Sequence, residues 1–247
     1  MLEIQEKELK VGNQHILYDG NMRDVKLTSW PYLFESYFLE QHQLIKKTAQ
    51  GRGTTYFFDW ESHKLVLRHY LRGGLVGKIN PEFYLNSKLE NTRPYKEWAL
   101  LCELQNLGLP APKPAGMRIV SGGLFYSADL LMHQLEAVTP LYDLLLKGEI
   151  NYWQNIGQVV RQFHNAGVYH DDLNCHNILL RGDEVFLIDF DKCVIKSDNA
   201  ESAIWKKKNL DRLLRSLNKE QGIAQTAGKG FHFSGSEWDE LLQAYSG

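Results

Sequence analysis

Short alternating apolar runs are concentrated in the first half of the chain, whereas helical patterns prevail in the second half. The turn residues Gly12-Asn13 and Asp19-Gly20 punctuate the first half, which predicts strands there. The strand-like runs are residues 1–27, 54–58, 65–70 and 117–132. Apolar residues at helical spacing predict helices at residues 31–47, 93–107, 141–146, 151–166 and 238–245, with irregular segments at 71–92 and 223–236.

Two of the helical segments carry unusual side chains. Residues 31–47 are rich in large apolar groups, which favours packing on the strands, with contact to a membrane surface as the alternative. A second amphipathic helix has an apolar stripe at Leu210, Leu213, Leu214 and Leu217 and a basic side at Lys206, Lys207, Lys208, Arg212 and Arg215. That side is either a solvated face or a contact for an anionic glycolipid or anionic lipid headgroups.

Residues 163–191 bring three polar side chains into an order that suits phosphoryl transfer. Asp172 and Asn177 are separated by a short loop, and Asn177 opens an apolar run. Arg181-Gly-Asp183 predicts a hairpin turn, so the returning strand ends with Asp189 beside Asn177. An amide oxygen and a carboxylate there form a pair of hard ligands suited to Mg²⁺. Asp172 is positioned one loop away to orient an attacking hydroxyl.

Composition excludes several classes of function. The chain has 247 residues, 43% hydrophobic and 23% charged, which fits one folded domain of two lobes or two small domains. A net charge of −2 gives no general attraction to nucleic acid. Cys102, Cys175 and Cys193 form no C-x-x-C pair, which favours a reducing compartment. No apolar run has the length of a membrane span and no secretion signal is visible, so we expect a soluble or peripheral protein.

The residues around the hairpin resemble the catalytic core of the protein-kinase-like superfamily. The run Asp172-Leu-Asn-Cys-His-Asn177 is similar to the catalytic loop, and Asp189-Phe190 is similar to the start of the DFG element. The resemblance implies that ATP donates the phosphate and that Asp172 accepts the proton of the acceptor hydroxyl. It also implies that Asn177 and Asp189 bind Mg²⁺.

The same resemblance implies an α+β fold of two lobes. An antiparallel-sheet N-lobe at residues 1–134 would bind nucleotide. A mainly helical, reduced C-lobe at residues 135–247 would carry the catalytic loop, the metal site and the acceptor site. In the N-lobe, Gly51 and Gly53 precede a β-prone run and are candidates for a turn whose N–H groups contact phosphate.

A basic residue and an acidic partner are expected beside the nucleotide. Arg68 lies in the strand where a protein kinase has a phosphate-binding Lys, and Arg can hold phosphate through two parallel donors. A shift of one position would assign this role to His69 instead. Glu97, in the first turn of the next helix, is the expected partner of Arg68, with Glu103 as the alternative.

Several positions depart from the protein-kinase pattern. Asp171 stands where most regulated protein kinases have the Arg that pairs with a phosphorylated activation loop. Asp191 replaces the usual Gly of DFG, and Asn174 replaces a Lys. Only residues 192–247 follow, without an Ala-Pro-Glu motif. These departures indicate a small-molecule or glycolipid kinase with fixed activity.

Further motifs cover most of residues 50–245. They are Leu67 to Gly74, Arg93 with Lys96-Glu97-Trp98, Gly108 to Pro114, His170 to Asn177, Ile188 to Asp191, Trp205, and Asn209 to Leu217. Together they resemble the 3-deoxy-D-manno-octulosonic acid (Kdo) kinase family, which is related to the lipopolysaccharide core heptose kinases. The resemblance implies ATP-dependent phosphorylation of a Kdo hydroxyl, taken as the 4-hydroxyl, on the anionic glycolipid Kdo-lipid IVA. It implies a peripheral location on the cytoplasmic face of a bacterial inner membrane, with no nucleic acid and no protein partner.

Three alternative functions remain open from the sequence. The first is another small-molecule phosphotransferase of the same fold, such as a core-heptose or aminoglycoside kinase; the basic residues between 204 and 215 disfavour a cationic acceptor. The second is a protein kinase, which the short C-lobe disfavours. The third is a non-catalytic ATP-binding module, which the presence of all three core polar residues disfavours.

Overall fold

The computed structural model describes residues 3–50, 53–70, 84–85, 88–123, 125–197, 199 and 202–247, and the chain divides into two units. The first unit is Met1–Asn106 with Pro112–Gln134, and the second is Leu107–Ala111 with Leu135–Gly247. The short segment 107–111 belongs to the second unit, where the N–H of Leu187 donates to the carbonyl of Pro110 at 3.0 Å.

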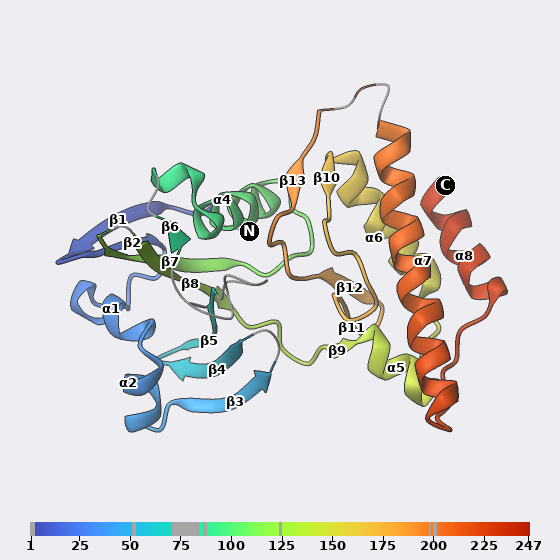
Figure 1. The fold of residues 1–247 in the computed structure, drawn as a ribbon, viewed down its shortest axis with the longest axis horizontal. Coiled ribbons are helices and arrows are strands. Elements are labelled where there is room, and N and C mark those ends of the chain that lie inside the picture. Colours follow the sequence, from blue (N-terminus) through green and yellow to red (C-terminus); the bar gives the residue numbers. More distant parts are fainter. Residues whose placement is uncertain are drawn as a thin grey trace. The chain divides into compact units, whose positions relative to one another are not determined.

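An antiparallel sheet forms the first unit, in the order β1-β2-β7-β8-β5-β4-β3, with β6 paired to β8 (Figure 1). The strands are β1 (Glu6–Val11), β2 (Gln14–Asp19), β3 (Ile45–Gln50), β4 (Thr54–Trp60), β5 (His63–His69), β6 (Tyr84–Leu85), β7 (Pro114–Gly122) and β8 (Phe125–His133). The predicted strands at 54–58, 65–70 and 117–132 are confirmed, as is the turn at Gly12, which has a positive φ of 58°.

Two short helices, and not the single predicted helix, occupy the start of residues 31–47. After the 3-10 turn η1 (Leu27–Ser29), they are α1 (Trp30–Leu33) and α2 (Ser36–Gln41), and residues from Ile45 form β3. Extended backbone at Glu35 (φ −101°, ψ 99°) separates the helices. A left-handed Gln43 (φ 54°) follows α2. The prediction was wrong because residues from Ile45 pair with β4 as an edge strand instead of continuing the helix.

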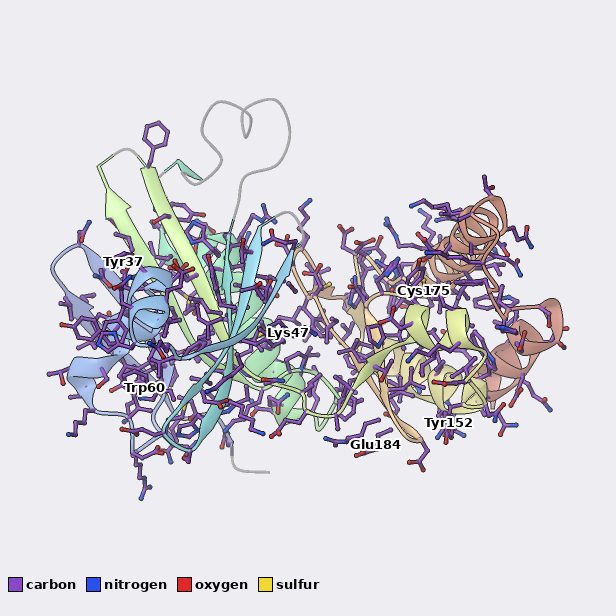
Figure 2. The ribbon with its side chains drawn as sticks, turned by 90° about the horizontal axis from the view of Figure 1, so that it is seen from below. Tyr37, Lys47, Trp60, Tyr152, Cys175 and Glu184 are labelled. Carbon is purple, nitrogen blue, oxygen red and sulfur yellow. The ribbon has the colours of Figure 1, made fainter. Side chains whose placement is uncertain are left out.

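The apolar side chains of this segment pack on the sheet, as the first of the two interpretations expected. Trp30, Leu33 and Leu39 are fully buried in one cluster with Phe58 and Leu65 of the strands. Each such side chain contributes roughly 1.5–3 kcal/mol through burial. Tyr32 of α1 and Tyr37 of α2 stay exposed, and Tyr37 is labelled in Figure 2.

The helix α4 (Arg93–Asn106) follows the 3-10 turn η2 (Leu89–Asn91) and packs on β7 and β8. Its predicted apolar positions Trp98, Leu101 and Leu104 are buried, and Gly108 follows it with a positive φ of 67°. Most of the segment 71–92, predicted as irregular, lies outside the described residues.

The second unit is mainly helical, with short strands. Its helices are α5 (Leu141–Lys147), α6 (Trp153–Asn165), α7 (Ser202–Thr226) and α8 (Gly235–Ser246) (Figure 1). Its strands are β9 (Thr139–Pro140), β10 (Val168–Tyr169), β11 (Ile178–Arg181), β12 (Glu184–Leu187) and β13 (Val194–Ile195). They form one sheet in the order β12-β11-β9 and a separate β10-β13 pair.

The helix α7 buries the predicted leucine stripe. Leu210, Leu213 and Leu217 are buried, whereas Leu214 is half-buried. The helix runs to Thr226, so the predicted irregular segment 223–236 begins later than expected, because buried Ala224 extends the packed face. Within the described part of the chain, none of the helices combines the length and the apolarity that a membrane crossing requires.

The helices α6 and α8 pack at very close range through Gly157. A Cβ built on this glycine would lie 2.2 Å from the carbonyl oxygen of Leu241 in α8. The backbones can approach in this way only because position 157 has no side chain.

We predict that Gly157→Ala destabilises the protein by about 1–3 kcal/mol, since the added methyl forces α8 away from α6. Gly222→Ala in α7 is the matched control: a Cβ there has no neighbour within 4 Å. It should stabilise by about 0.5–1 kcal/mol through helix propensity. Chemical denaturation of both variants measures the two changes, and a Gly157→Ala variant as stable as wild type would contradict the packing argument.

Candidate active site

The hairpin β11–β12 puts Asp189 next to Asn177, as the sequence predicted. The strands pair from Ile178 opposite Leu187, and the N–H of Ile188 donates to the carbonyl of Asn177 at 3.0 Å. Asp189 follows directly and adopts a left-handed backbone, with φ of 63°. That conformation costs free energy for a residue with a side chain, and such residues concentrate at functional sites.

The side-chain amide of Asn177 has a defined orientation. Its Nδ2 donates to the backbone carbonyl of Asp172 at 2.9 Å. Because the nitrogen is used within the loop, Oδ1 is the atom available to a ligand, and an amide oxygen suits a hard cation. Asn177 thus ties together the catalytic-loop residue Asp172 and the candidate metal site.

The side chain of Asn174 forms hydrogen bonds to the backbone of the catalytic loop. Its Oδ1 accepts hydrogen bonds from the N–H groups of His176 (2.8 Å) and Asn177 (3.2 Å), and its Nδ2 donates to the carbonyl of Asp172 at 3.0 Å. Where protein kinases place a Lys, this chain therefore uses an amide to hold the loop backbone.

The His170 ring connects the backbone at Asp172 with the backbone at Ile188, the residue before Asp189. The N–H of Asp172 donates to its Nδ1 at 3.3 Å, so Nε2 carries the proton and donates to the carbonyl of Ile188 at 3.0 Å. Burial lowers the pKa of His170 below its ordinary value, although the Ile188 carbonyl and acidic neighbours including Asp189 favour the protonated form. The neutral imidazole thereby fixes the backbone on either side of the site.

A buried side chain of α7 holds the loop in place, and sequence reasoning assigned it no role. Asn209 is fully buried; its Oδ1 accepts from the N–H of His170 and its Nδ2 donates to the carbonyl of His170, both at 3.0 Å. The same Oδ1 lies 3.3 Å from Nε2 of His164, whose Nδ1 is 2.8 Å from the hydroxyl of Tyr245. Burial lowers the pKa of His164 to about 4. Two signals were available: Asn209 opens the motif Asn209 to Leu217, and it is a polar residue beside the buried stripe of an amphipathic helix.

One of the five predicted basic residues reaches the catalytic loop. Nη1 of Arg212 lies 3.4 Å from Oδ1 of Asp172, and both side chains are partly exposed. Lys207 instead pairs with Asp211 at 2.8 Å. Lys206 lies over the ring of Trp205, with Nζ 5.6 Å from its centroid. The two remaining residues, Lys208 and Arg215, are exposed.

In the first unit, the strand β5 and the helix α4 bring Arg68 and Glu97 together. Nη2 of Arg68 forms an ion pair with Oε2 of Glu97, which is 2% exposed as a side chain. Tyr70, directly after β5, donates its hydroxyl to the same carboxylate oxygen and lies under the Arg68 guanidinium, 5.1 Å from it. Burial, followed by the charge of Glu97, raises the pKa of Tyr70 well above its usual value. Tyr70 was missed; its spacing of two from Arg68 was the available signal.

His69 and Glu103, the alternatives to Arg68 and Glu97, have different surroundings. His69 follows Arg68 and therefore points to the opposite face of the sheet, where its Nδ1 lies 2.6 Å from Asp129. Glu103 is exposed on α4. Gly53 lies between β3 and β4, directly before Thr54, whereas Gly51 is outside the described residues.

Asn177 and Asp189 could supply two of the ligands of Mg²⁺, which is part of its coordination shell. In the described part of the chain, no group of three or more His, Cys, Asp or Glu side chains is arranged to hold a metal ion. Asn177 and Asp189 offer one amide oxygen and one carboxylate. Mg²⁺ characteristically accepts one or two protein ligands and completes its shell with water and substrate phosphate, so this pair fits that ion.

Comparison with known proteins identifies the family. The sequence profile described as "Lipopolysaccharide kinase (Kdo/WaaP) family" matches residues 37–245. The chain is 41% identical to the 3-deoxy-D-manno-octulosonic acid kinase of Photobacterium profundum, over 97% of this chain and 98% of the relative. It is 42% identical to the enzyme of the same name from Mannheimia succiniciproducens, over 87% and 90%.

A solved structure shows the same fold. It is described as "WaaP in complex with acyl carrier protein", and it matches with a TM-score of 0.54 and 13% identity over 90% of this chain and 86% of that one. The predicted α+β, protein-kinase-like fold is thereby confirmed. The catalytic-loop motif, the profile match and the nearly full-length relatives lead to one conclusion: the chain belongs to the lipopolysaccharide kinase (Kdo/WaaP) family, whose members are phosphotransferases.

Proposed function

We propose that this protein is an ATP-dependent Kdo kinase of lipopolysaccharide biosynthesis that phosphorylates the 4-hydroxyl of Kdo in Kdo-lipid IVA. The observation that carries the proposal is the joined set of Asp172, Asn177 and Asp189 in a chain that is 41% identical to a Kdo kinase along nearly its whole length. Incubation with ATP and Kdo-lipid IVA, followed by mass spectrometry for one added phosphate, tests it. A panel with heptose-containing core acceptors separates it from a core-heptose kinase.

In the proposed mechanism, Asp172 orients the acceptor hydroxyl and takes its proton as the hydroxyl oxygen bonds to the γ-phosphorus of ATP. The bond between the γ-phosphorus and the β,γ-bridging oxygen breaks, and ADP leaves. Asn177 and Asp189 would hold Mg²⁺, which would offset the negative charge of the phosphate groups. His170 and Asn209 keep the loop backbone fixed, so that the Asp172 carboxylate meets the hydroxyl without a prior rearrangement.

We assign nucleotide binding to the first unit and catalysis to the second. Arg68, held by Glu97 and Tyr70, would bind phosphate oxygens of ATP through its guanidinium. Gly53, directly before β4, would supply its N–H group to the phosphates. Because Glu97 and Tyr70 fix one edge of the guanidinium, the side chain has little freedom left to lose when ATP binds.

Arg212 is the best candidate for recognition of the acceptor. Its position beside Asp172 would let it bind the Kdo carboxylate while the hydroxyl lies at the catalytic carboxylate. Lys206, Lys207, Lys208 and Arg215 would add a general attraction for the anionic glycolipid. A peripheral location on the cytoplasmic face of the inner membrane, where such a lipid is accessible, accords with this surface.

The first prediction for this site concerns the metal. Asp189→Ala should abolish phosphate transfer, and EDTA should do the same to the wild type, because one of two proposed protein ligands is lost. Asp183→Ala, in the exposed turn of the same hairpin, is the control and should retain activity. Turnover of Asp189→Ala near the wild-type value would rule out the metal assignment.

The second concerns the proton acceptor. Asp172→Asn keeps the shape of the side chain but removes its basicity, so kcat should fall by roughly 10²–10⁴-fold while ATP affinity is kept. Asp171→Asn next to it should change kcat far less. If instead ATP affinity fell and kcat held, Asp172 would be a nucleotide ligand and the alignment of the loop would be wrong.

The third concerns the acceptor. Arg212→Gln should raise the KM for Kdo-lipid IVA about fivefold, which is about 1 kcal/mol for one basic residue, and leave the KM for ATP unchanged. Lys207→Gln, on the same helix, should have a smaller effect because Asp211 already neutralises Lys207. Steady-state kinetics at low salt compare the two. Equal acceptor KM values for Arg212→Gln and wild type would assign Arg212 to the solvated face.

A further inference from the structure

The catalytic loop lies along one face of α7. Four side chains of the helix contact successive parts of the loop: Asn209 meets His170, Arg212 meets Asp172, Ser216 meets Cys175, and Glu220 meets His176. The four residues of α7 are three or four positions apart, so they share one side of the helix. We call this row of pairs the loop–α7 contact.

The loop–α7 contact is closed at one end and open at the other. Asn209 and His170 are buried, and together they fill the closed end. The side chains of Asp172, Arg212 and His176 are 51%, 41% and 49% exposed. A ligand whose hydroxyl lies at Asp172 therefore finds accessible side chains of this contact in the direction of His176.

The half-exposed ring of His176 has a fixed position. The N–H of His176 donates to Oδ1 of Asn174 at 2.8 Å. The ring packs on Tyr142 of α5, with centroids 4.4 Å apart, and Nε2 is 3.6 Å from Oε1 of Glu220. The N–H of Tyr142 in turn donates to the carbonyl of Cys175 at 3.2 Å. The two rings therefore form one ordered pair, which the proposed reaction steps do not use.

The chemistry of this pair suits a sugar ring. Tyr142 and His176 supply aromatic carbon, and the hydroxyl of Tyr142 and Nδ1 of His176 supply polar atoms. A sugar has an apolar C–H face and a rim of hydroxyl groups, so it matches such a surface. Glu220 lies beside the His176 ring and pairs with Lys219 at 3.5 Å. Because these two charges offset each other, the pair attracts an anion far less than Arg212 does.

We propose that Tyr142 and His176 form a subsite for the sugar ring to which the phosphorylated sugar is linked. This inference rests on the proposed function, in which the Kdo hydroxyl lies at Asp172 and the Kdo carboxylate at Arg212. Eight residues of helix separate Arg212 from Glu220, about 12 Å along the axis. One sugar ring does not span that distance, whereas two linked rings do. The subsite thus selects glycosidically linked Kdo over a Kdo monosaccharide.

Two soluble acceptors without acyl chains test the subsite. One is Kdo linked to the deacylated sugar backbone of lipid IVA, and the other is the methyl glycoside of Kdo. The kcat/KM of the wild type should be higher on the linked acceptor by about fivefold or more. His176→Ala and Tyr142→Leu should each raise the KM for the linked acceptor about fivefold and leave the KM for the methyl glycoside unchanged.

Three controls accompany these variants. Tyr142→Phe keeps the ring and should behave like the wild type. His42→Ala is the matched control, because His42 is also exposed and stacks on an aromatic ring, that of Phe38, in the first unit. Melting temperatures report folding, and His176→Ala should stay folded because Asn174 holds the loop backbone through hydrogen bonds that involve no ring. If Tyr142→Leu melts below the wild type, His176→Ala alone decides.

Four outcomes would overturn the subsite. The first is an unchanged KM of folded His176→Ala for the linked acceptor. The second is an equal loss on both acceptors, which would give the ring a role in the loop alone. The third is equal kcat/KM of the wild type on both acceptors. The fourth is turnover of acylated Kdo-lipid IVA only, which would assign recognition beyond Kdo to the acyl chains.

Failure of the proposed function has a different signature. The wild type would then phosphorylate neither soluble acceptor nor Kdo-lipid IVA, and the subsite would be refuted together with the Kdo kinase proposal. Wild-type turnover of Kdo-lipid IVA retains the proposed function whatever the variants of Tyr142 and His176 show.

Discussion

The buried amide of Asn209 ties the catalytic loop to the longest helix. It satisfies both the N–H and the carbonyl of His170, two backbone groups that have no strand or helix partner at that point. Leaving a buried backbone group unpaired costs roughly 1–3 kcal/mol, so this single side chain decides whether the loop can be buried in its observed shape. His170 then fixes the N–H of Asp172 and the carbonyl of Ile188, and the residues proposed for proton transfer and metal binding depend on that backbone.

Further contacts tie the same region to its surroundings. The hydroxyl of Ser216 on α7 accepts a hydrogen bond from the N–H of Cys175 at 3.3 Å (Cys175 is labelled in Figure 2). Tyr245 of α8 reaches His164, which in turn contacts Asn209. The close approach of α8 to Gly157 of α6 keeps this hydrogen-bonded chain in place. The packing of α8 therefore also helps to hold the catalytic loop in its observed shape.

Besides the Asn209 amide, the structure depends on the buried charge of Glu97. A carboxylate that is almost completely removed from water is tolerated only when it is paired and hydrogen-bonded. Arg68 supplies the charge and Tyr70 supplies the hydrogen bond. This arrangement stabilises a buried ion pair and, under the proposed function, also presents the outer edge of the Arg68 guanidinium to phosphate. Stability and binding would then use the same three side chains.

The sequence by itself determined what local patterns and motif spacing can specify. The hairpin at Arg181 to Asp183, the helix around Trp98 and the leucine stripe of α7 formed as predicted, because each depends on neighbours within a few residues. The adjacency of Asn177 and Asp189 followed from strand pairing across that hairpin. The family was recognisable for the same reason, since its motifs are short and ordered along the chain.

Only the tertiary structure decided the partners that lie far apart in sequence. The long helix predicted at 31–47 was wrong because pairing with β4 outweighs local helix propensity in residues 45–50. The choice of Glu97 over Glu103, and of Arg68 over His69, depends on which face of α4 meets which face of the sheet. The roles of Asn209, Tyr70 and Arg212 depend on contacts across 27 to 40 positions. No periodicity encodes such contacts, because a lone polar residue in an apolar stripe acquires its partner only when the packed elements enclose it.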